Sequence, residues 1–349
     1  MKTSDFDYEL PEALIAQTPA VPRDSARMMV IDPVAGTRED RVFRDFPDFL
    51  DPRDVLVLND TRVIPARLLG VKEDTGVPCE VLLLRRLDLT RWEALVRPGR
   101  RLRAGSRVVF GEGRLTAVME DTTSAGGRVV RFGYEGVFEE LLDALGQMPL
   151  PPYIHEKLED PSQYQTVYAR LDGSAAAPTA GLHFTDEVLC RIRDKGVDIV
   201  PVLLHVGLGT FRPVKDENVE DHVMHEEFYR ISPEAAGRIN AARERGGRIV
   251  CAGTTTVRTL ESAADEKGRV LPGEGMTDIF ITPGYRFKAT DALMTNFHLP
   301  RSTLLMLVSA LMGREEALKS YREAVDKRYR FFSFGDCMFI TKKIPEAGL

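Results

Sequence analysis

The chain contains 349 residues, of which 43% are hydrophobic and 29% are charged. This length is typical of two domains, and the composition excludes a collagen, a disordered tail protein and a disulfide-stapled miniprotein. The formal net charge of −6 argues against a protein that coats nucleic acid indiscriminately.

Cysteine spacing and the first residues indicate a reducing compartment. No two of the four cysteines stand close enough for the CxxC pattern of zinc sites and redox pairs. Residues 1–15 are acidic and lack the apolar core of a signal peptide. The longest apolar stretch, residues 304–312, is far shorter than the ~20 residues that span a bilayer. We therefore expect a soluble, cytoplasmic protein without membrane contact.

The first 136 residues contain short β-prone runs. Two precede residue 60, at 28–31 and 55–58. Five more follow, separated by glycines, at 81–84, 92–96, 107–110, 115–119 and 128–132. Closely spaced strands with glycine turns predict a small antiparallel barrel or sandwich.

From residue 137 onward the pattern alternates between helix and strand. Ser232, followed by a proline, is typical of a helix N-cap. Residues 302–312 are apolar on nearly all faces and predict a buried helix. Other expected helices cover 185–195, 256–265 and 314–327, and expected strands cover 197–205, 248–252 and 278–282. The sequence predicts a mixed α/β domain, residues 1–60 and 150–349, with an inserted small antiparallel β-barrel, residues 61–149.

Glycine- and threonine-rich segments follow the predicted strands, where α/β folds bind ligands. LHVGLGTFRP carries His205, Gly207 and Gly209, and these glycines allow a ligand close to the backbone. AGTTTVRTLE opens a helix, whose free N–H groups suit an anion or carboxylate, although Thr254–Thr256 also fit ordinary capping. Neither segment is a dinucleotide fingerprint or a P-loop.

Three further segments carry histidine. PTAGLHF contains His183, which on its own fits a structural helix-entry turn. MTNFHLPRSTLL places Asn296, His298 and Arg301 just before the buried helix, where polar side chains are costly without a partner. DHVMHEE does not have the HExxH spacing, so we favour a structural or substrate-contact role over a metal site and expect no metal.

Positive charge is concentrated in the predicted insert. Residues 62–115 hold twelve basic and six acidic residues, so the remainder of the chain carries −12. The densest cluster predicts either a solvated strand edge or a phosphate-binding surface, and its arginines are Arg97, Arg100, Arg101, Arg103 and Arg107. A second basic–aromatic patch, residues 327–332 with Arg330, fits a helix end or a binding surface equally well.

The ordered set of segments resembles the S-adenosylmethionine:tRNA ribosyltransferase-isomerase family of queuosine biosynthesis. The resemblance spans nearly the whole chain and is weakest at residues 87–147. Its matching stretches are FDYELPEALIAQTPAVPRDSARMMV, VLVLNDTRVIPARL, LPPYI, YQTVYAR, APTAGLHFT, HVGLGTFRPV, GTTTVRTLES, DIFITPGYRF and LMTNFHLPRSTLLMLVSAL.

This resemblance implies an α/β domain with an inserted β-barrel and an unusual transferase. The ribosyl part of S-adenosylmethionine would be transferred and isomerised onto 7-aminomethyl-7-deazaguanine at the wobble position of a tRNA with a GUN anticodon. Epoxyqueuosine-tRNA, adenine and methionine would be the products. S-adenosylmethionine is then a consumed substrate, and no cofactor is expected.

Roles can be assigned as hypotheses on that basis. His205 or His298 would supply the base or acid, because histidine titrates near neutrality, with Asp60 and Glu261 as second choices. The methionine carboxylate or ribose would lie among Gly207, Gly209, Thr210, Thr254, Thr255 and Thr256. Asn59, Asp60, Thr61 and Arg62 would contact the modified base, and the other predicted substrate contacts are His183, Asn296 and Arg301. Predicted tRNA contacts are Arg97, Arg100, Arg101, Arg103 and Arg330.

Three other classes remain open: a non-catalytic tRNA-binding module, a methyltransferase and a nucleoside hydrolase. The missing glycine fingerprint argues against the methyltransferase, and four polar strand ends exceed what a binding module needs. We expect a monomer, because no exposed apolar stripe is evident.

Overall fold

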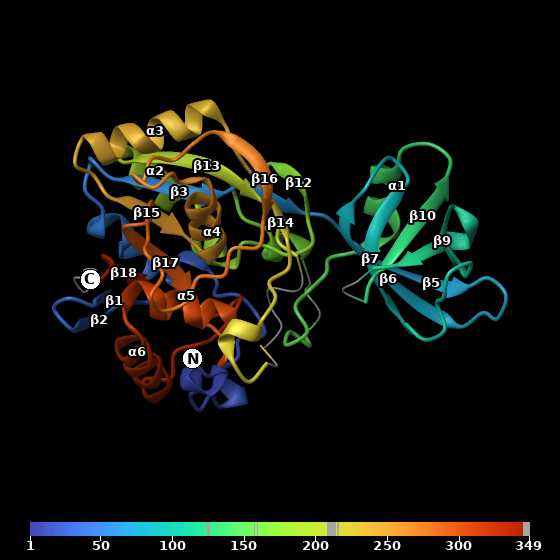
Figure 1. The fold of residues 1–349 in the computed structure, drawn as a ribbon, viewed down its shortest axis with the longest axis horizontal. Coiled ribbons are helices and arrows are strands. Elements are labelled where there is room, and N and C mark those ends of the chain that lie inside the picture. Colours follow the sequence, from blue (N-terminus) through green and yellow to red (C-terminus); the bar gives the residue numbers. More distant parts are fainter. Residues whose placement is uncertain (124–125, 157, 159, 208–213, 215, 345–349) are drawn as a thin grey trace. The chain divides into compact units, whose positions relative to one another are not determined.

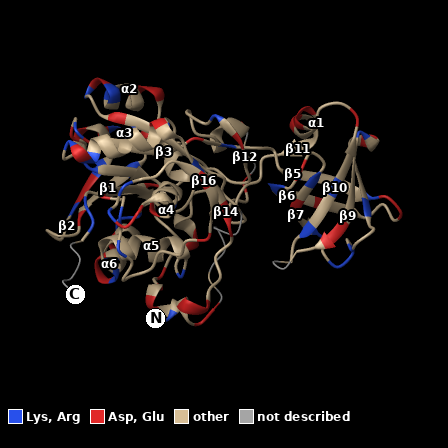
Figure 2. Ribbon diagram, turned by 45° about the horizontal axis from the view of Figure 1, so that its top comes forward, with Lys and Arg blue, Asp and Glu red and all other residues tan. Residues whose placement is uncertain are grey.

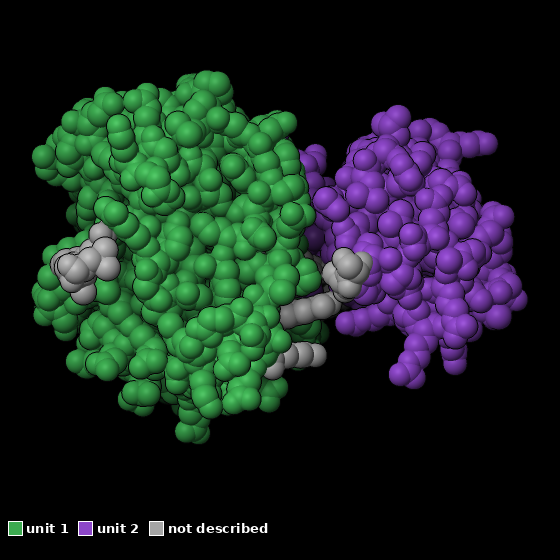
Figure 3. Space-filling view, viewed as in Figure 1, with its two compact units in different colours: residues 1–61, 152–170, 178–349 green, residues 62–151, 171–177 purple. Residues whose placement is uncertain are grey.

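The computed structural model describes residues 1–123, 126–156, 158, 160–207, 214 and 216–344. The chain forms two compact units (Figure 3). Unit 1 comprises Met1–Thr61, Pro152–Arg170 and Pro178–Leu349, and unit 2 comprises Arg62–Pro151 and Leu171–Ala177. No helix among the described residues is both long and apolar enough to cross a membrane.

Unit 1 contains a nine-stranded mixed sheet in the order β16-β14-β13-β3-β15-β17-β18-β1-β2 (Figure 1). Its four central strands, β13, β3, β15 and β17, run parallel, so their carboxyl ends meet at one edge. The strands are β1 (Arg27–Asp32), β2 (Thr37–Val42), β3 (Val55–Asn59), β13 (Asp198–Leu204), β14 (Glu227–Ile231), β15 (Ile249–Ala252), β16 (Gly273–Thr277), β17 (Ala292–Asn296) and β18 (Cys337–Ile340). The mixed α/β prediction is thereby confirmed.

Both faces of this sheet are covered. Helices α3 (Pro233–Glu244), α4 (Thr254–Ala263), α5 (Thr303–Met312) and α6 (Arg314–Asp326) contribute to one apolar core. Helix α2 (Asp186–Asp194) and the 3-10 helices Phe43–Phe49 and Thr179–His183 contribute to the core on the other face. The predicted buried helix is confirmed as α5, which carries no charge and is uniformly tan in Figure 2.

Capping and strand position show where local sequence signals succeed and fail. The predicted cap is confirmed, because the Ser232 hydroxyl accepts a hydrogen bond from the Ala235 N–H at 3.1 Å. The predicted strand at 278–282 is wrong, because the ladder with β14 uses the more polar Gly273–Thr277. The apolar run Ile279–Ile281 instead packs against the core and belongs to no strand. Its hydrophobicity therefore reflects burial in the core and not pairing with a neighbouring strand.

Unit 2 is a closed six-stranded antiparallel barrel, which confirms the predicted insert. Strand order is β5-β6-β7-β10-β9-β8, and pairing of β8 with β5 closes it. Closure depends on Gly70, where a Cβ atom would lie 2.5 Å from both the Phe110 ring and the Val109 carbonyl oxygen. The elements are β5 (Arg67–Lys72), β6 (Pro78–Arg86), β7 (Arg91–Arg97), β8 (Arg107–Phe110), β9 (Leu115–Thr122), β10 (Arg128–Tyr134), α1 (Phe138–Leu145) and β11 (Gly146–Gln147), with a separate ribbon of β4 (Thr61–Val63) and β12 (Leu171–Ser174).

Candidate active site

The carboxyl edge of the four parallel strands gathers many of the predicted site residues. Residues 59–61 end β3 and follow it, His205 and Gly207 follow β13, residues 254–256 open α4 after β15, and Asn296 ends β17. The predicted contacts Gly209 and Thr210 lie outside the described residues. Among the described residues, no three His, Cys, Asp or Glu side chains form a group that could hold a metal ion.

Asn59 connects three elements at this edge. Its Nδ2 donates to the Leu204 carbonyl at 2.9 Å and to the Thr255 hydroxyl at 3.3 Å, and its Oδ1 accepts from the Leu204 N–H at 3.0 Å. Oδ1 also accepts from the Thr61 N–H at 3.2 Å. Both Nδ2 and Oδ1 of this fully buried amide are thus hydrogen-bonded within the protein. These bonds fix β3, β13 and α4 relative to one another.

His205 is the best-placed titratable side chain at the edge. Its Nδ1 lies 2.9 Å from the Thr61 hydroxyl, and its ring stacks on Phe228 with the centroids 5.9 Å apart. Burial, assisted by the Arg230 cation, lowers the pKa of His205 to about 4. The imidazole is therefore neutral at pH 7. When Nδ1–H donates to Thr61, the Nε2 lone pair is available to accept a proton.

Asp60 lies beside Thr61 and is also buried. Its Oδ2 accepts from Arg170, at 3.1 Å from Nε and 3.0 Å from Nη2. Burial nevertheless raises the pKa of Asp60, against the opposing pull of Arg170 and Arg230. Sequence reasoning assigned no role to Arg170 or Arg230, although Arg170 ends the YQTVYAR stretch.

The TAGLHF segment packs against Tyr168 through Gly181. The hydroxyls of Tyr168 and Thr166 are both buried, and neither has a hydrogen-bond partner in the described part of the chain. A Cβ atom at Gly181 would lie 2.1 Å from the Tyr168 hydroxyl and 2.8 Å from the Thr166 methyl group. Because of this contact, and not because of a positive φ, a Cβ atom at this position requires a neighbouring side chain to shift.

We expect Gly181→Ala to destabilise unit 1 by about 1–3 kcal/mol through overpacking. Tyr168→Phe removes the nearest atom, so Gly181→Ala should cost less in the Tyr168→Phe background. Denaturant unfolding of the four proteins in this cycle measures the difference. Equal costs in both backgrounds would show that the Tyr168 hydroxyl is not the obstacle.

His183 and Asn296 form a second buried polar pair. The Nε2 of His183 lies 3.2 Å from the Asn296 Oδ1, and the Asn296 Nδ2 donates to the Phe332 carbonyl at 2.8 Å. Burial lowers the pKa of His183 to about 4, and the cations of Arg330 and Arg23 add to this effect. Both guanidiniums donate to backbone carbonyls, Arg330 to that of Thr18 and Arg23 to those of Ser162 and Gln165.

His298 occupies a different environment from His183. Its Nε2 lies 3.2 Å from the hydroxyl of Thr295, the neighbour of Asn296 in β17, and successive strand side chains point to opposite faces of a sheet. Tyr8 donates to its carbonyl, and its N–H bonds the Tyr321 hydroxyl at 3.1 Å. Burial lowers the pKa of His298 to about 3.

The structure does not bring Glu261 and Arg301 to the His205 cluster. Glu261 lies seven residues beyond Thr254, about 10 Å along α4. There its carboxylate accepts from the N–H groups of Lys288 and Ala289 at 2.8 and 3.1 Å. Arg301 is exposed and paired with Asp7.

A buried ion pair that the sequence did not reveal lies next to Gly207, which follows β13. Glu227 of β14 accepts from the Gly207 N–H at 2.8 Å through Oε1 and from the Arg258 guanidinium through Oε2. Glu227 and Arg258 are 4% and 2% exposed, so the pair is desolvated. Glu227 and Arg258 are 31 residues apart in sequence, so the pair becomes evident only when β13, β14 and α4 are seen in contact.

In unit 2, the arginine cluster lies at the end of β7 and in the loop that follows it. Arg97, Arg100, Arg101 and Arg103 are exposed, and none forms an ion pair with a carboxylate within the described part of the chain. Leu102 is fully buried, and its carbonyl accepts from Arg128 Nε at 3.0 Å. Arg128 thus holds the loop while its arginines face solvent. Arg62 lies elsewhere in this unit, with Nε 3.7 Å from Asp172.

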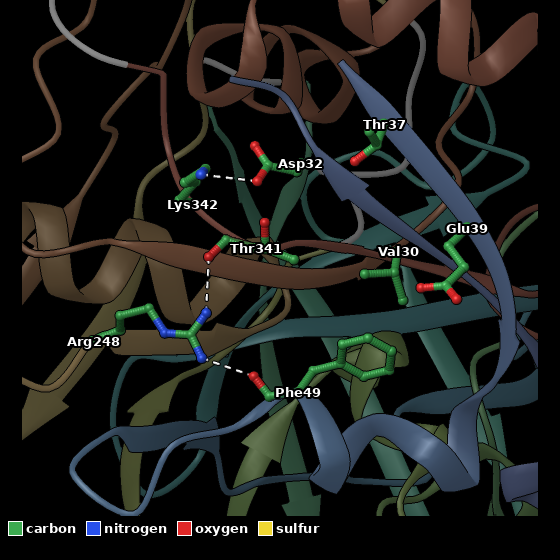
Figure 4. Close-up of a pocket in the computed structure, with 8 residues that line it drawn as sticks. All are labelled: Val30, Asp32, Thr37, Glu39, Phe49, Arg248, Thr341 and Lys342. Atoms are coloured by element: carbon green, nitrogen blue, oxygen red, sulfur yellow. Dashed lines mark hydrogen bonds and ion pairs between the residues drawn. The ribbon is translucent and has the colours of Figure 1, made fainter. Parts of the chain in front are cut away.

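A hollow of about 420 Å³ lies at the opposite edge of the sheet (Figure 4). Its charged side chains are already paired: Lys342 with Asp32 at 2.8 Å, and Arg248 with Asp54 at 2.6 Å. Arg248 precedes β15, so the hollow adjoins the amino ends of the parallel strands, away from the polar edge. We do not assign the site to it.

The chain is similar to known proteins over nearly its full length. The model of a family described as a queuosine biosynthesis protein matches residues 3–340. Relatives named S-adenosylmethionine:tRNA ribosyltransferase-isomerase are 64% identical in Symbiobacterium thermophilum and 60% in Desulfitobacterium hafniense, each over 97% of this chain and 100% of the relative. A crystal structure of S-adenosylmethionine tRNA ribosyltransferase from Thermotoga maritima is 41% identical, with a TM-score of 0.56, and covers 97% of this chain and 100% of that chain.

Proposed function

Because this chain belongs to the queuosine biosynthesis protein family, we propose that it is a cytoplasmic S-adenosylmethionine:tRNA ribosyltransferase-isomerase. It transfers and isomerises the ribosyl moiety of S-adenosylmethionine onto 7-aminomethyl-7-deazaguanine at the wobble position of a tRNA with a GUN anticodon. The products are epoxyqueuosine-tRNA, adenine and methionine. S-adenosylmethionine is consumed, no cofactor takes part, and the enzyme acts as a monomer.

One observation carries the chemical part of the proposal: a neutral histidine and a buried carboxyl at adjacent strand ends. The sulfonium acidifies the ribose C5′, and His205 Nε2 accepts that proton while Nδ1–H donates to Thr61. Asp60, whose pKa burial raises, is the nearby group that can return a proton to departing adenine. Loss of the C5′ proton breaks the C4′–O4′ bond, and the freed O4′ becomes the C1′ carbonyl oxygen as the C1′–N9 bond to adenine breaks. The amine of the modified base then bonds to C4′, which returns the electron pair to C5′. C5′ adds to the C1′ carbonyl and closes the five-carbon ring, and the resulting C1′ alkoxide bonds to C5′ to form the epoxide as the C5′–S bond breaks and methionine leaves.

A single incubation tests the proposal against the other classes. The protein is mixed with S-adenosylmethionine and tRNA bearing the precursor base, and the small products are separated. Adenine and methionine in equal amounts, formed only with this tRNA, support the transferase. S-adenosylhomocysteine would identify a methyltransferase, products independent of tRNA a hydrolase, and intact S-adenosylmethionine a binding module.

The exposed arginines of unit 2 support tRNA binding, because unpaired guanidiniums match phosphate. We expect replacement of Arg97, Arg100, Arg101 and Arg103 by glutamine to weaken tRNA binding about 10- to 100-fold at 0.15 M salt. The slope of log K against log salt should fall by up to about 3.6. The KM for S-adenosylmethionine should be unchanged.

A matched control removes the same charge from arginines of unit 2 that are already paired with carboxylates. These are Arg85, Arg86, Arg91 and Arg131, which are paired with Glu93, Glu139, Asp88 and Glu120. Filter binding across a salt series compares the two quadruple variants. An equal loss in both would assign the effect to net charge and not to this loop.

A further inference from the structure

Arg258 has an unused hydrogen-bonding edge in the interior of unit 1. Its Nη1 donates to Glu227, but Nε and Nη2 are buried and have no acceptor among the residues that the structure describes. Nε–H and Nη2–H point in parallel along the same side of a guanidinium, the side that binds carboxylates with two hydrogen bonds. Burying charged donors without acceptors costs free energy of folding. We therefore expect this edge to bind an acceptor group of a ligand.

The position of Arg258 connects it to the strand-end site. Residues three and four apart share a helix face, so Arg258 lies on the face of α4 that carries Thr254 and Thr255. Helical side chains lean toward the N-terminus, which brings the guanidinium toward the first turn of α4. No side chain caps that turn among the described residues. Through Glu227, the same guanidinium is joined to Gly207, two residues from His205.

We propose that the Nε–Nη2 edge of Arg258 binds the carboxylate of the methionyl part of S-adenosylmethionine, an inference that rests on the proposed function. Within that substrate only the carboxylate offers two coplanar, charged acceptor oxygens. A tRNA phosphate is the other anion available, but a side chain that is 2% exposed is accessible to a small inserted group and not to a nucleic-acid backbone. Glu227 holds Arg258 in place and is a positioning residue.

The test compares S-adenosylmethionine with decarboxylated S-adenosylmethionine, which lacks only the carboxylate. We expect the wild-type protein to bind the intact compound about 10- to 100-fold more tightly in equilibrium dialysis. Arg258→Lys keeps the pairing charge for Glu227 but has no two-pronged edge. It should weaken S-adenosylmethionine binding by that factor and leave the decarboxylated compound unaffected. Affinity for tRNA should not change.

Two further variants keep the result interpretable. Arg238→Lys, on α3 and paired with Asp198, is the matched control and should bind like wild type. Glu227→Gln leaves the edge of Arg258 intact, so discrimination between the two compounds should persist.

Specific outcomes would overturn this inference. The first is that the wild-type protein binds both compounds with equal affinity. The second is that Arg258→Lys lowers the affinity for both compounds equally, or for neither. The wild-type comparison decides the question even if Arg258→Lys does not fold. The proposed function fails separately, through absence of adenine release by wild-type enzyme with precursor tRNA.

Discussion

Replacing His205 with alanine is expected to reduce adenine release by about 10²- to 10⁴-fold, the usual contribution of a positioned acid or base. The protein should remain folded and bind S-adenosylmethionine, because the His205 ring contacts Thr61 and Phe228 at the edge of the core. Single-turnover adenine release with precursor tRNA measures the loss. His225→Ala, at an exposed histidine, is the control and should keep normal turnover.

The pH dependence provides a second readout of the same prediction. Because the pKa of His205 is lowered to about 4, its base form persists as pH falls, and the wild-type rate should not drop near pH 6.5. A decline should begin only near pH 5 and steepen toward pH 4. Thr61→Val should reduce turnover less than His205→Ala, because it removes the orienting hydrogen bond and not the base. Near-normal turnover of His205→Ala with intact binding would disprove the assignment.

The second large effect concerns acid stability. His183 and His298 have pKa values lowered to about 4 and about 3 by burial, against about 6.5 in the unfolded chain. Below pH 6.5 the unfolded chain therefore binds more protons, so stability falls with pH until both states are protonated. The shifts correspond to losses of about 3 kcal/mol for His183 and about 5 kcal/mol for His298.

The measurement is the free energy of unfolding of unit 1 between pH 7 and pH 5. Normal carboxylates have not yet titrated in this window, so the slope reports histidine. We expect His183→Gln/His298→Gln to reduce it to the part contributed by His205, whose pKa is also lowered to about 4, and His225→Gln to leave it unchanged. All six histidines lie in unit 1, whereas Trp92, the single tryptophan, lies in unit 2. Trp92 fluorescence is thus an internal control, and an unflattened slope in the double variant would contradict the prediction.

Much of the fold could be predicted from the sequence, because many of its elements depend only on residues that are close in the chain. The Ser232 cap and the uniformly apolar α5 depend on neighbouring residues alone. Closure of the barrel by β8 and β5 depends on contacts between Gly70 and residues 109–110, and strand register depends on the partner strand. The misplaced strand at 278–282 failed for that second reason.

The site was predictable to the extent that it follows strand ends. Parallel strands bring their carboxyl ends together, which is why Thr61 and His205 meet although 144 residues separate them. The Glu227–Arg258 pair could not be found this way, because Glu227 begins an antiparallel strand and Arg258 lies inside a helix. Glu261 is close to Thr254 in sequence but lies about 10 Å from it along α4, a separation that sequence proximity alone does not indicate.

The strand order of unit 1 also has a consequence for synthesis on the ribosome. Strand β3 lies between β13 and β15, and β1 pairs with β18. Strand β3 therefore has no partner until residues 198–252 have emerged, and the pairing of β1 with β18 waits for residues 337–340, whereas the barrel strands of unit 2 pair within residues 67–134. Long-range pairing of this kind is slow and leaves apolar strands exposed meanwhile. The inserted barrel is thus positioned to fold first, while the residues of the candidate active site converge only after β13 and the start of α4 have been synthesised.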